Sequence, residues 1–321
     1  MFKLAAQDNS ILEVEATEFK AISWNIEGFS RHLHSLKCFT DNFQSDFVFI
    51  SEPQVFQNDI DLLMQPLRGE YNYSLNSADK YDLDLPLVKA RAHGGTMILW
   101  KTCHDPYISL HPVSTPAILP LIFSPPCNPV SIHVCVYLPT HGQDTQFVAE
   151  LSTLSACLLQ LLEKYPEAPI YLRGDFNVSD KNKRRIQLFK YFCSSFDLTE
   201  TDIGHKTYHH FMGNGASDSN LDKLVFSSIL RHPESVLEIC CKLSNPLVFS
   251  SHDLIVSKFA LPRIAAEPPS EDNIVAPKVI NSRVKVVWDE TGIEKYQEIV
   301  VPELNRIQQI WLHSFFFIRT R

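Results

Sequence analysis

Ala168-Pro-Ile-Tyr-Leu-Arg-Gly-Asp-Phe-Asn177 is the stretch of sequence that decides the fold. Its first half is apolar and bounded by proline, a pattern that predicts a buried strand rather than a helix. The predicted strand ends at Gly174, and Asp175 and Asn177 follow two positions apart. Residues two apart on an extended backbone point to the same side, so a carboxylate and a carboxamide are presented together. Active sites of layered α/β proteins commonly lie at such strand ends.

Apolar strands that end in polar residues recur along the chain. Strands are predicted over 19–24, 46–50, 94–100, 130–137, 221–226, 236–240 and 254–259, and helices over 30–43, 58–67, 146–165 and 181–196. One polar residue at a strand end is more often a surface or packing residue than a functional one. Strands of one layered core bring their ends to a common rim, however, so the whole set predicts one active site. Its members are Asn25, Glu52, Tyr137, Asp175, Asn177, Asp222 and His252.

The composition is that of an ordinary globular protein. The chain has 321 residues, 45% of them hydrophobic, and a net charge of -8. This charge argues against a general nucleic-acid coat, but it allows an enzyme that gathers carboxylates around a metal. The eight cysteines contain no CxxC pair, so the sequence indicates neither a zinc site nor a disulfide framework and favours a reducing compartment. With no apolar N-terminal segment and no apolar run of about 20 residues, we expect an intracellular protein, not secreted and not spanning a membrane.

The composition changes after Leu261, which predicts a domain boundary. Residues 1–18 are interpreted as a lead-in and 19–261 as the catalytic domain. The proline-rich segment 262–281 is predicted to be a linker. Residues 282–321 have helical spacing without strand partners, so we expect a short helical extension there.

Six short motifs carry a resemblance to a known family. In order and spacing they resemble the endonuclease/exonuclease/phosphatase superfamily, which includes the DNase I-like nucleases and abasic-site endonucleases: Ser23-Trp-Asn-Ile-Glu27, Phe49-Ile-Ser-Glu52, Val136-Tyr-Leu-Pro139, Arg173-Gly-Asp-Phe-Asn177, Ser219-Asn-Leu-Asp222 and Ser250-Ser-His252. The resemblance implies an α+β fold, a four-layer αββα sandwich. Within the family, residues 207–222 look most like the apurinic-type endonuclease domains of invertebrate non-LTR retrotransposons. The tail, with Trp288, Tyr296 and Trp311, is similar to the segment that links such domains to a reverse transcriptase, so we expect a piece of a longer polyprotein.

The resemblance implies a role for each rim residue. Glu52 and Asn25 would hold Mg²⁺, with Mn²⁺ as the alternative, since hard cations take oxygen ligands. Asp175 would orient or deprotonate the attacking water, and Asn177 would hold both the phosphate and Asp175. His252, oriented by Asp222, would contact a phosphate oxygen as an imidazolium, and Tyr137 would complete the phosphate shell. Nucleic-acid contacts are predicted for Arg173, Lys183, Arg184, Arg185 and Thr207, although the basic run at 181–190 is equally typical of a solvated helix face. Residues 207–210 are expected in a loop beside the substrate groove, with no role assigned to His209 and His210.

One position departs from the family pattern. The family usually has Ser-Asp-His where this chain has Ser250-Ser251-His252, so a carboxylate is missing, and Asp253 is expected to point to the opposite face of its strand. The function implied is a Mg²⁺-dependent DNA endonuclease whose nick leaves a 3′-hydroxyl that primes reverse transcription. Acting on genomic DNA, it would be nuclear. Two alternatives remain open: a phosphatase of the same fold acting on inositol phosphates or sphingolipids, and a non-catalytic transposon remnant.

Overall fold

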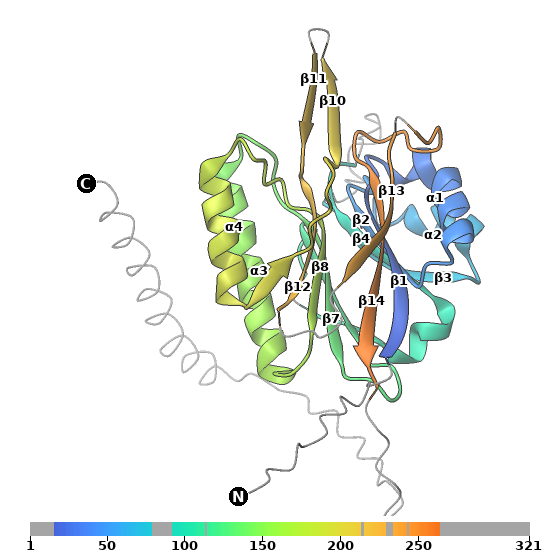
Figure 1. The fold of residues 1–321 in the computed structure, drawn as a ribbon. Coiled ribbons are helices and arrows are strands. Elements are labelled where there is room, and N and C mark those ends of the chain that lie inside the picture. Colours follow the sequence, from blue (N-terminus) through green and yellow to red (C-terminus); the bar gives the residue numbers. More distant parts are fainter. Residues whose placement is uncertain are drawn as a thin grey trace, which may run out of the picture. The chain divides into compact units, whose positions relative to one another are not determined.

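Figure 1 shows the computed structural model, in which residues 16–78, 92–112, 114–212, 215–228, 234–242 and 244–263 are described. The chain divides into two compact units, residues 1–266 and 267–321. The first unit contains the whole of the predicted catalytic domain. The predicted lead-in before residue 16, most of the linker and the helical extension lie outside the described residues.

One mixed sheet carries both the first and the last strands of the domain. Its order is β13 (Ser235–Cys240), β14 (Leu254–Pro262), β1 (Ala16–Asn25), β2 (Phe47–Ser51), β4 (Thr96–Lys101) and β3 (Tyr71–Asn76). β1 runs antiparallel to β14 and parallel to β2. The end of β1 therefore lies between the end of β2 and the start of β14, which brings three of the predicted motifs to one edge.

The second sheet is built around the strand predicted from residues 168–177. Its order is β5 (Ile108–Leu110), β6 (Ile118–Phe123), β7 (Ser131–Tyr137), β8 (Ile170–Asp175), β12 (Asp222–Ser227) and β9 (Leu198–Glu200). β8 is parallel to β7 and antiparallel to β12. In this register Asp175 is paired with Tyr137 on one side and with Asp222 on the other.

The two sheets pack face to face with helices on their outer faces (Figure 1). Alternate residues of the strands meet in the layer between the sheets, where Phe47, Phe123, Tyr171 and Phe259 are buried together. α1 (Phe29–Phe43) and α2 (Ile60–Leu63) cover the β1 sheet, and α3 (Asp144–Lys164) and α4 (Lys183–Ser195) cover the β8 sheet. The predicted four-layer αββα sandwich is confirmed.

α3 is the one helix, within the described ranges, that is long and apolar enough to cross a membrane. One of its faces, with Phe147, Leu151, Leu154, Leu158 and Leu161, lies buried in the core beneath the β8 sheet. Packing inside this domain thus accounts for the apolar residues on that face of α3.

The sequence analysis was wrong about two segments. The helix predicted over 58–67 is only the short α2 followed by a 3-10 turn, η1 (Gln65–Leu67); a second such turn, η2 (Thr102–Tyr107), follows β4. The loop predicted over 207–210 runs instead into a hairpin of β10 (Tyr208–Met212) and β11 (Gly215–Ser219), which projects from the sandwich in Figure 1. The sequence of β11 consists of small and polar residues and lacks the alternation that marks a strand. Its strand conformation comes from backbone pairing with β10.

Candidate active site

Asp175 lies at the centre of the rim and is held from both sheets. The Nδ2 of Asn25, at the end of β1, donates to Asp175 Oδ2 at 3.0 Å and to Glu52 Oε1 at 3.0 Å. The backbone N–H of Asn177 donates to Asp175 Oδ1 at 2.9 Å, and its Nδ2 donates to Oδ2 at 3.2 Å. Three hydrogen bonds therefore hold the carboxylate of Asp175 in place, and a fourth, also from Asn25, links it to Glu52.

The approach of the two sheets at this point depends on Gly174. The φ of Gly174 is +132°, and a Cβ there would lie 2.1 Å from the carbonyl oxygen of Val136 and 2.9 Å from Ser51 Oγ. Ser51 Oγ, from the other sheet, donates to that Val136 carbonyl at 3.1 Å and accepts from the N–H of Asp175 at 3.3 Å. Glycine is required because a side chain would separate the strands that carry the site.

His252 and Asp222 form a buried pair beside Asp175. His252 Nδ1 lies 2.8 Å from Asp222 Oδ2, and His252 Nε2 lies 3.9 Å from Asp175 Oδ2. Thr207 Oγ1 accepts from the N–H of Asp222 at 3.1 Å, and Trp24 Nε1 donates to the carbonyl of His252 at 3.2 Å. With Nδ1–H bound to Asp222, the imidazole presents Nε2 to the rim.

Burial and charge move the pKa values of this site in useful directions. Burial raises the pKa of Asp175 to about 7, aided by Asp222 and Glu52 and opposed by His252. Burial would lower the pKa of His252, but Asp222, with help from Asp175 and Glu27, raises it to about 10. At neutral pH the site thus combines a carboxylate able to take a proton with an imidazolium able to give a hydrogen bond.

Glu52 and Tyr137 lie on opposite sheets and meet at the same rim. Glu52 follows β2 with a φ of +51°, and its N–H donates to the carbonyl of Gly95 at 3.1 Å. Burial raises the pKa of the Tyr137 hydroxyl, and the charges of Glu52 and Asp175 and a hydrogen bond to Glu52 raise it further. All seven predicted rim residues are therefore brought together by the fold.

Glu27 is a site residue to which the sequence analysis gave no role. Its Oε2 accepts from the N–H of Ser251 at 2.7 Å and from Ser250 Oγ at 3.2 Å. Ser250 Oγ also donates to the carbonyl of Asn25 at 2.6 Å. A carboxylate from the segment that follows β1 thus lies against Ser251, the position at which the resemblance leads one to expect an aspartate. The signal available in the sequence was the same two-residue spacing that marks Asp175 and Asn177.

Tyr208, the first residue of the β10–β11 hairpin, also borders the site. Its ring centroid lies 4.8 Å from that of His252, and the two residues form an isolated backbone bridge. Burial raises the pKa of Tyr208, as do the nearby charges of Glu27, Asp175 and Glu52. The hairpin is therefore anchored to the rim at its base.

The prediction that Arg173 contacts nucleic acid is wrong. Arg173 is completely buried between the sheets, where its Nε donates to Glu234 Oε1 at 2.7 Å and its NH1 lies 3.0 Å from His133 Nδ1. Its guanidinium also stacks on the ring of Phe49, with 4.5 Å from Cζ to the centroid. β8 alternates strictly, so Arg173 shares the face of Asp175 but lies two residues deeper in the layer between the sheets.

Two further predicted nucleic-acid contacts are also wrong, because both residues are buried. The guanidinium of Arg185 donates to the carbonyls of Pro139, Thr140 and Asn177 and pairs with Asp144 at 2.8 Å. It thereby fastens the loops that carry Asn177 and follow Tyr137. Thr207 is fully buried, and its hydroxyl accepts from the N–H of Asp222.

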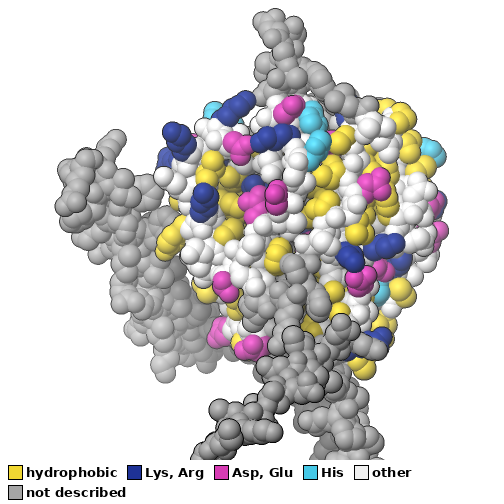
Figure 2. All heavy atoms as spheres, in the orientation of Figure 1, with side chains coloured by type: hydrophobic (Ala, Val, Ile, Leu, Met, Phe, Trp, Pro, Cys, Tyr) yellow, Lys and Arg dark blue, Asp and Glu magenta, His cyan; other side chains and the backbone are white. Residues whose placement is uncertain are grey.

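Lys183 and Arg184, in contrast, are exposed in the first turn of α4. Figure 2 shows Lys and Arg side chains gathered at the upper left, over the part of the molecule where α4 lies. These two residues remain available for contact with phosphate.

The donor set at the rim fits a divalent cation. Four carboxyl groups meet at this mostly buried site, those of Glu27, Glu52, Asp175 and Asp222. Among the described side chains, the protonated ring of His252 is the positive charge that faces them. Asn25 Nδ2 links the carboxylates of Glu52 and Asp175, and a bound cation would neutralise the negative charge that they bring together. Carboxylate and amide oxygens are the ligands that Mg²⁺ prefers. The groups suited to hold it are therefore the carboxylates of Glu52 and Glu27 and the side-chain amide oxygen of Asn25.

The four-layer sandwich places the chain in a structural class: it has the DNase I-like fold, which is also found in solved nucleases and phosphatases. No protein-family model matches the chain, and no curated protein matches it in sequence.

Three solved structures illustrate the similarity of fold. The endonuclease domain of TRAS1, a telomere-specific non-LTR retrotransposon, has a TM-score of 0.57 at 12% identity, over 75% of this chain and 98% of that one. The AP endonuclease of Leishmania major has a TM-score of 0.55 at 13% identity, over 77% and 88%. The 3′ phosphatase NExo from Neisseria, bound to a product DNA hairpin, has a TM-score of 0.56 at 12% identity, over 75% and 99%.

Proposed function

We propose that this protein is a Mg²⁺-dependent phosphodiester hydrolase that nicks DNA and leaves a 3′-hydroxyl. The observation that carries the proposal is the juxtaposition of Asp175, with its pKa raised to about 7, and the His252–Asp222 pair, 3.9 Å away. A poised base beside a fixed imidazolium, with metal-binding carboxylates adjacent, suits hydrolysis of a phosphodiester.

In the proposed reaction, Asp175 takes a proton from the attacking water. Asn25 and Asn177 hold its carboxylate in place. His252, kept charged by Asp222, donates through Nε2 to a non-bridging phosphate oxygen and stabilises the developing negative charge. The P–O3′ bond breaks as the water oxygen bonds to phosphorus, and the 3′ oxygen takes up a proton from solvent. Glu52, Glu27 and the side-chain amide oxygen of Asn25 would hold Mg²⁺, which would supply charge neutralisation at the phosphoryl group and the leaving oxygen.

DNA as the substrate is supported by two observations. Lys183 and Arg184 are exposed on α4, which follows the segment that carries Asp175 and Asn177. Solved structures of the same fold include a retrotransposon endonuclease domain and an AP endonuclease. We further propose that the chain belongs to a retrotransposon polyprotein with a reverse transcriptase, and that it acts in the nucleus on genomic DNA.

Nicking of supercoiled plasmid tests the proposal. Wild-type protein is expected to convert the plasmid to the open circle with Mg²⁺ and not with EDTA. Asp175→Asn should lower the rate by at least about 100-fold, the lower range for loss of a general base. Glu163→Gln, an exposed carboxylate of α3, is the matched control. A DNA polymerase should extend the nick directly if it carries a 3′-hydroxyl. Wild-type nicking that persists in EDTA or in Asp175→Asn would contradict the proposal.

The same assay series separates the two alternatives. Phosphate release from an inositol polyphosphate or a sphingolipid phosphate, without plasmid nicking, would indicate the phosphatase. Turnover of neither substrate would indicate the non-catalytic remnant. Ser251→Asp restores the usual family residue next to Glu27; unchanged Mg²⁺-dependent turnover in this variant would show that Glu27 already meets the need for a carboxylate there.

A further inference from the structure

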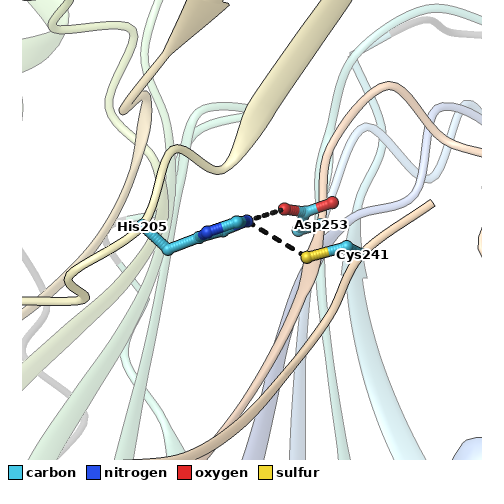
Figure 3. A group of neighbouring side chains, drawn as sticks. All are labelled: His205, Cys241 and Asp253. Carbon is cyan, nitrogen blue, oxygen red and sulfur yellow. Dashed lines mark hydrogen bonds and ion pairs between the residues drawn. The ribbon is translucent and has the colours of Figure 1, made fainter. Parts of the chain in front are cut away.

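A second group of metal-ligating side chains lies behind His252, outside the proposed catalytic site. His205, Cys241 and Asp253 come from three separate segments: the loop before β10, the residue after β13 and the residue before β14. Figure 3 shows the imidazole of His205 pointing between the carboxylate of Asp253 and the thiol of Cys241. Asp253 follows His252 directly but points away from it, as the alternation of a strand requires.

Two of the three distances in this group are short. His205 Nε2 lies 3.1 Å from Asp253 Oδ2 and 3.1 Å from Cys241 Sγ, and the three atoms all lie within 4.8 Å of one another. A nitrogen with one hydrogen can direct it at only one of two such partners. His205 Nε2 therefore makes only one of these two hydrogen bonds at a time, whereas one cation placed among the three atoms can take a lone pair from each of them.

The carboxylate of Asp253 is fully buried and held in position by its surroundings. Its Oδ1 accepts from the N–H of Lys242 at 3.3 Å, and its Oδ2 lies 3.0 Å from His209 Nε2. The other ring nitrogen of His209 lies 3.0 Å from Asp218 Oδ1. Supporting bonds of this kind, in which a histidine is itself held by a carboxylate, orient the ligands of protein metal sites.

From this geometry we propose that His205 Nε2, Cys241 Sγ and Asp253 Oδ2 bind Zn²⁺. Nitrogen, sulfur and carboxylate oxygen together are a donor set typical of zinc, and softer than the all-oxygen rim. Zinc bond lengths with tetrahedral angles require about 3.4 Å between the nitrogen and oxygen ligands and about 3.6 Å between nitrogen and sulfur. The observed 3.1 Å separations need an opening of only about 0.3 to 0.5 Å to reach these values. Binding releases the thiol proton of Cys241 to solvent.

His205 is partly exposed, with 40% of its side chain accessible, so the fourth position of the zinc faces solvent and is filled by water. The ion would fasten together the loop that leads into the β10–β11 hairpin and the ends of β13 and β14. It would thereby stiffen both segments that flank His252. This inference does not depend on the proposed hydrolase activity.

Metal binding to the purified full chain, stripped with a chelator, tests the inference. Zn²⁺ is titrated in competition with a chromogenic chelator, and Co²⁺ is used as a spectroscopic probe. We expect one tight zinc per chain and a thiolate-to-cobalt absorption band. Cys241→Ser, a near-isosteric change, should abolish the band and weaken zinc binding by more than about 100-fold, beyond the usual effect of losing a supporting residue. Cys127→Ser, at an exposed cysteine, is the matched control and should change neither.

Glu52→Gln separates this site from the catalytic rim. Tight zinc binding and the cobalt band should persist in Glu52→Gln, because that residue belongs to the other site. The inference is overturned if wild type binds zinc no more tightly than Cys241→Ser does, if no thiolate band forms, or if Glu52→Gln rather than Cys241→Ser removes the tight site. Circular dichroism of each variant without metal establishes that loss of binding is not loss of fold.

Discussion

Asp222→Asn should make the activity depend on pH in a way that exposes the charge on His252. Asp222 is the main group that raises the pKa of His252 to about 10 against the opposing effect of burial. The amide oxygen of asparagine can still accept from His252 Nδ1–H, so the ring keeps its place, but the negative charge is gone. The pKa of His252 should then fall to about 6.5 or lower, the ordinary value or less.

The size of the loss follows from the protonated fraction. At pH 8 the imidazolium is almost complete with a pKa of about 10, and is about 3% of the total with a pKa of 6.5. The ratio of wild-type to variant kcat/KM should therefore be about 30 at pH 8 and about 300 at pH 9. On the acid side of the pH–activity profile, activity rises with pH because Asp175 must be ionised to accept a proton. A cation at Glu52 favours the ionised form of Asp175, so the midpoint of this rise should lie below about pH 7.

Initial nicking rates at subsaturating DNA, measured from pH 6 to 9 at constant ionic strength, give the profile. Glu163→Gln serves as the control and should follow wild type at every pH. A loss in Asp222→Asn that stays the same from pH 6 to 9 would refute the reasoning, because Asp222 would then act by position alone.

Three other predictions concern the fold and the DNA surface. Gly174→Ala should lower the free energy of unfolding, measured with urea, by about 3 kcal/mol or more, because its Cβ would meet the Val136 carbonyl at 2.1 Å; Gly142→Ala, also at positive φ but with open space around it, should cost about 1 kcal/mol. Arg173→Met should lower stability by about 3 to 5 kcal/mol, since it leaves a buried glutamate unpaired, and should leave the salt dependence of DNA binding unchanged. Replacing Lys183 and Arg184 together by Gln should reduce the slope of log binding constant against log salt by up to about 2, measured by fluorescence anisotropy; an unchanged slope would show that these residues form only a solvated helix face.

The corrected residues show where local patterns mislead. Arg173 precedes the Gly-Asp-Phe-Asn motif, and proximity along the chain suggested a role in binding. Strand alternation places Arg173 on the face of Asp175, but packing against the opposite sheet, which supplies Phe49 from β2 and Phe259 from β14 as ring partners, decides that it is buried. Arg185 belonged to a basic run, yet its guanidinium fastens backbone carbonyls of the site loops. Neither outcome depends on charge alone.

The sequence by itself predicted the long apolar strands and the polar residues at their ends, because both hydrophobic alternation and the same-side placement of Asp175 and Asn177 are local properties of an extended backbone. The four-layer fold was expected from the resemblance of six motifs, and short strands such as β3 and β9 were not predicted. Only the tertiary structure decided which residues meet across the chain. Glu27 bonds Ser251 from 224 positions away. The group of His205, Cys241 and Asp253 has no CxxC-like spacing, so composition indicated no zinc site. Their contacts depend on the pairing of β1 with β14 and of β13 with β14, and such non-local register is a property of the packed sheets rather than of any single stretch.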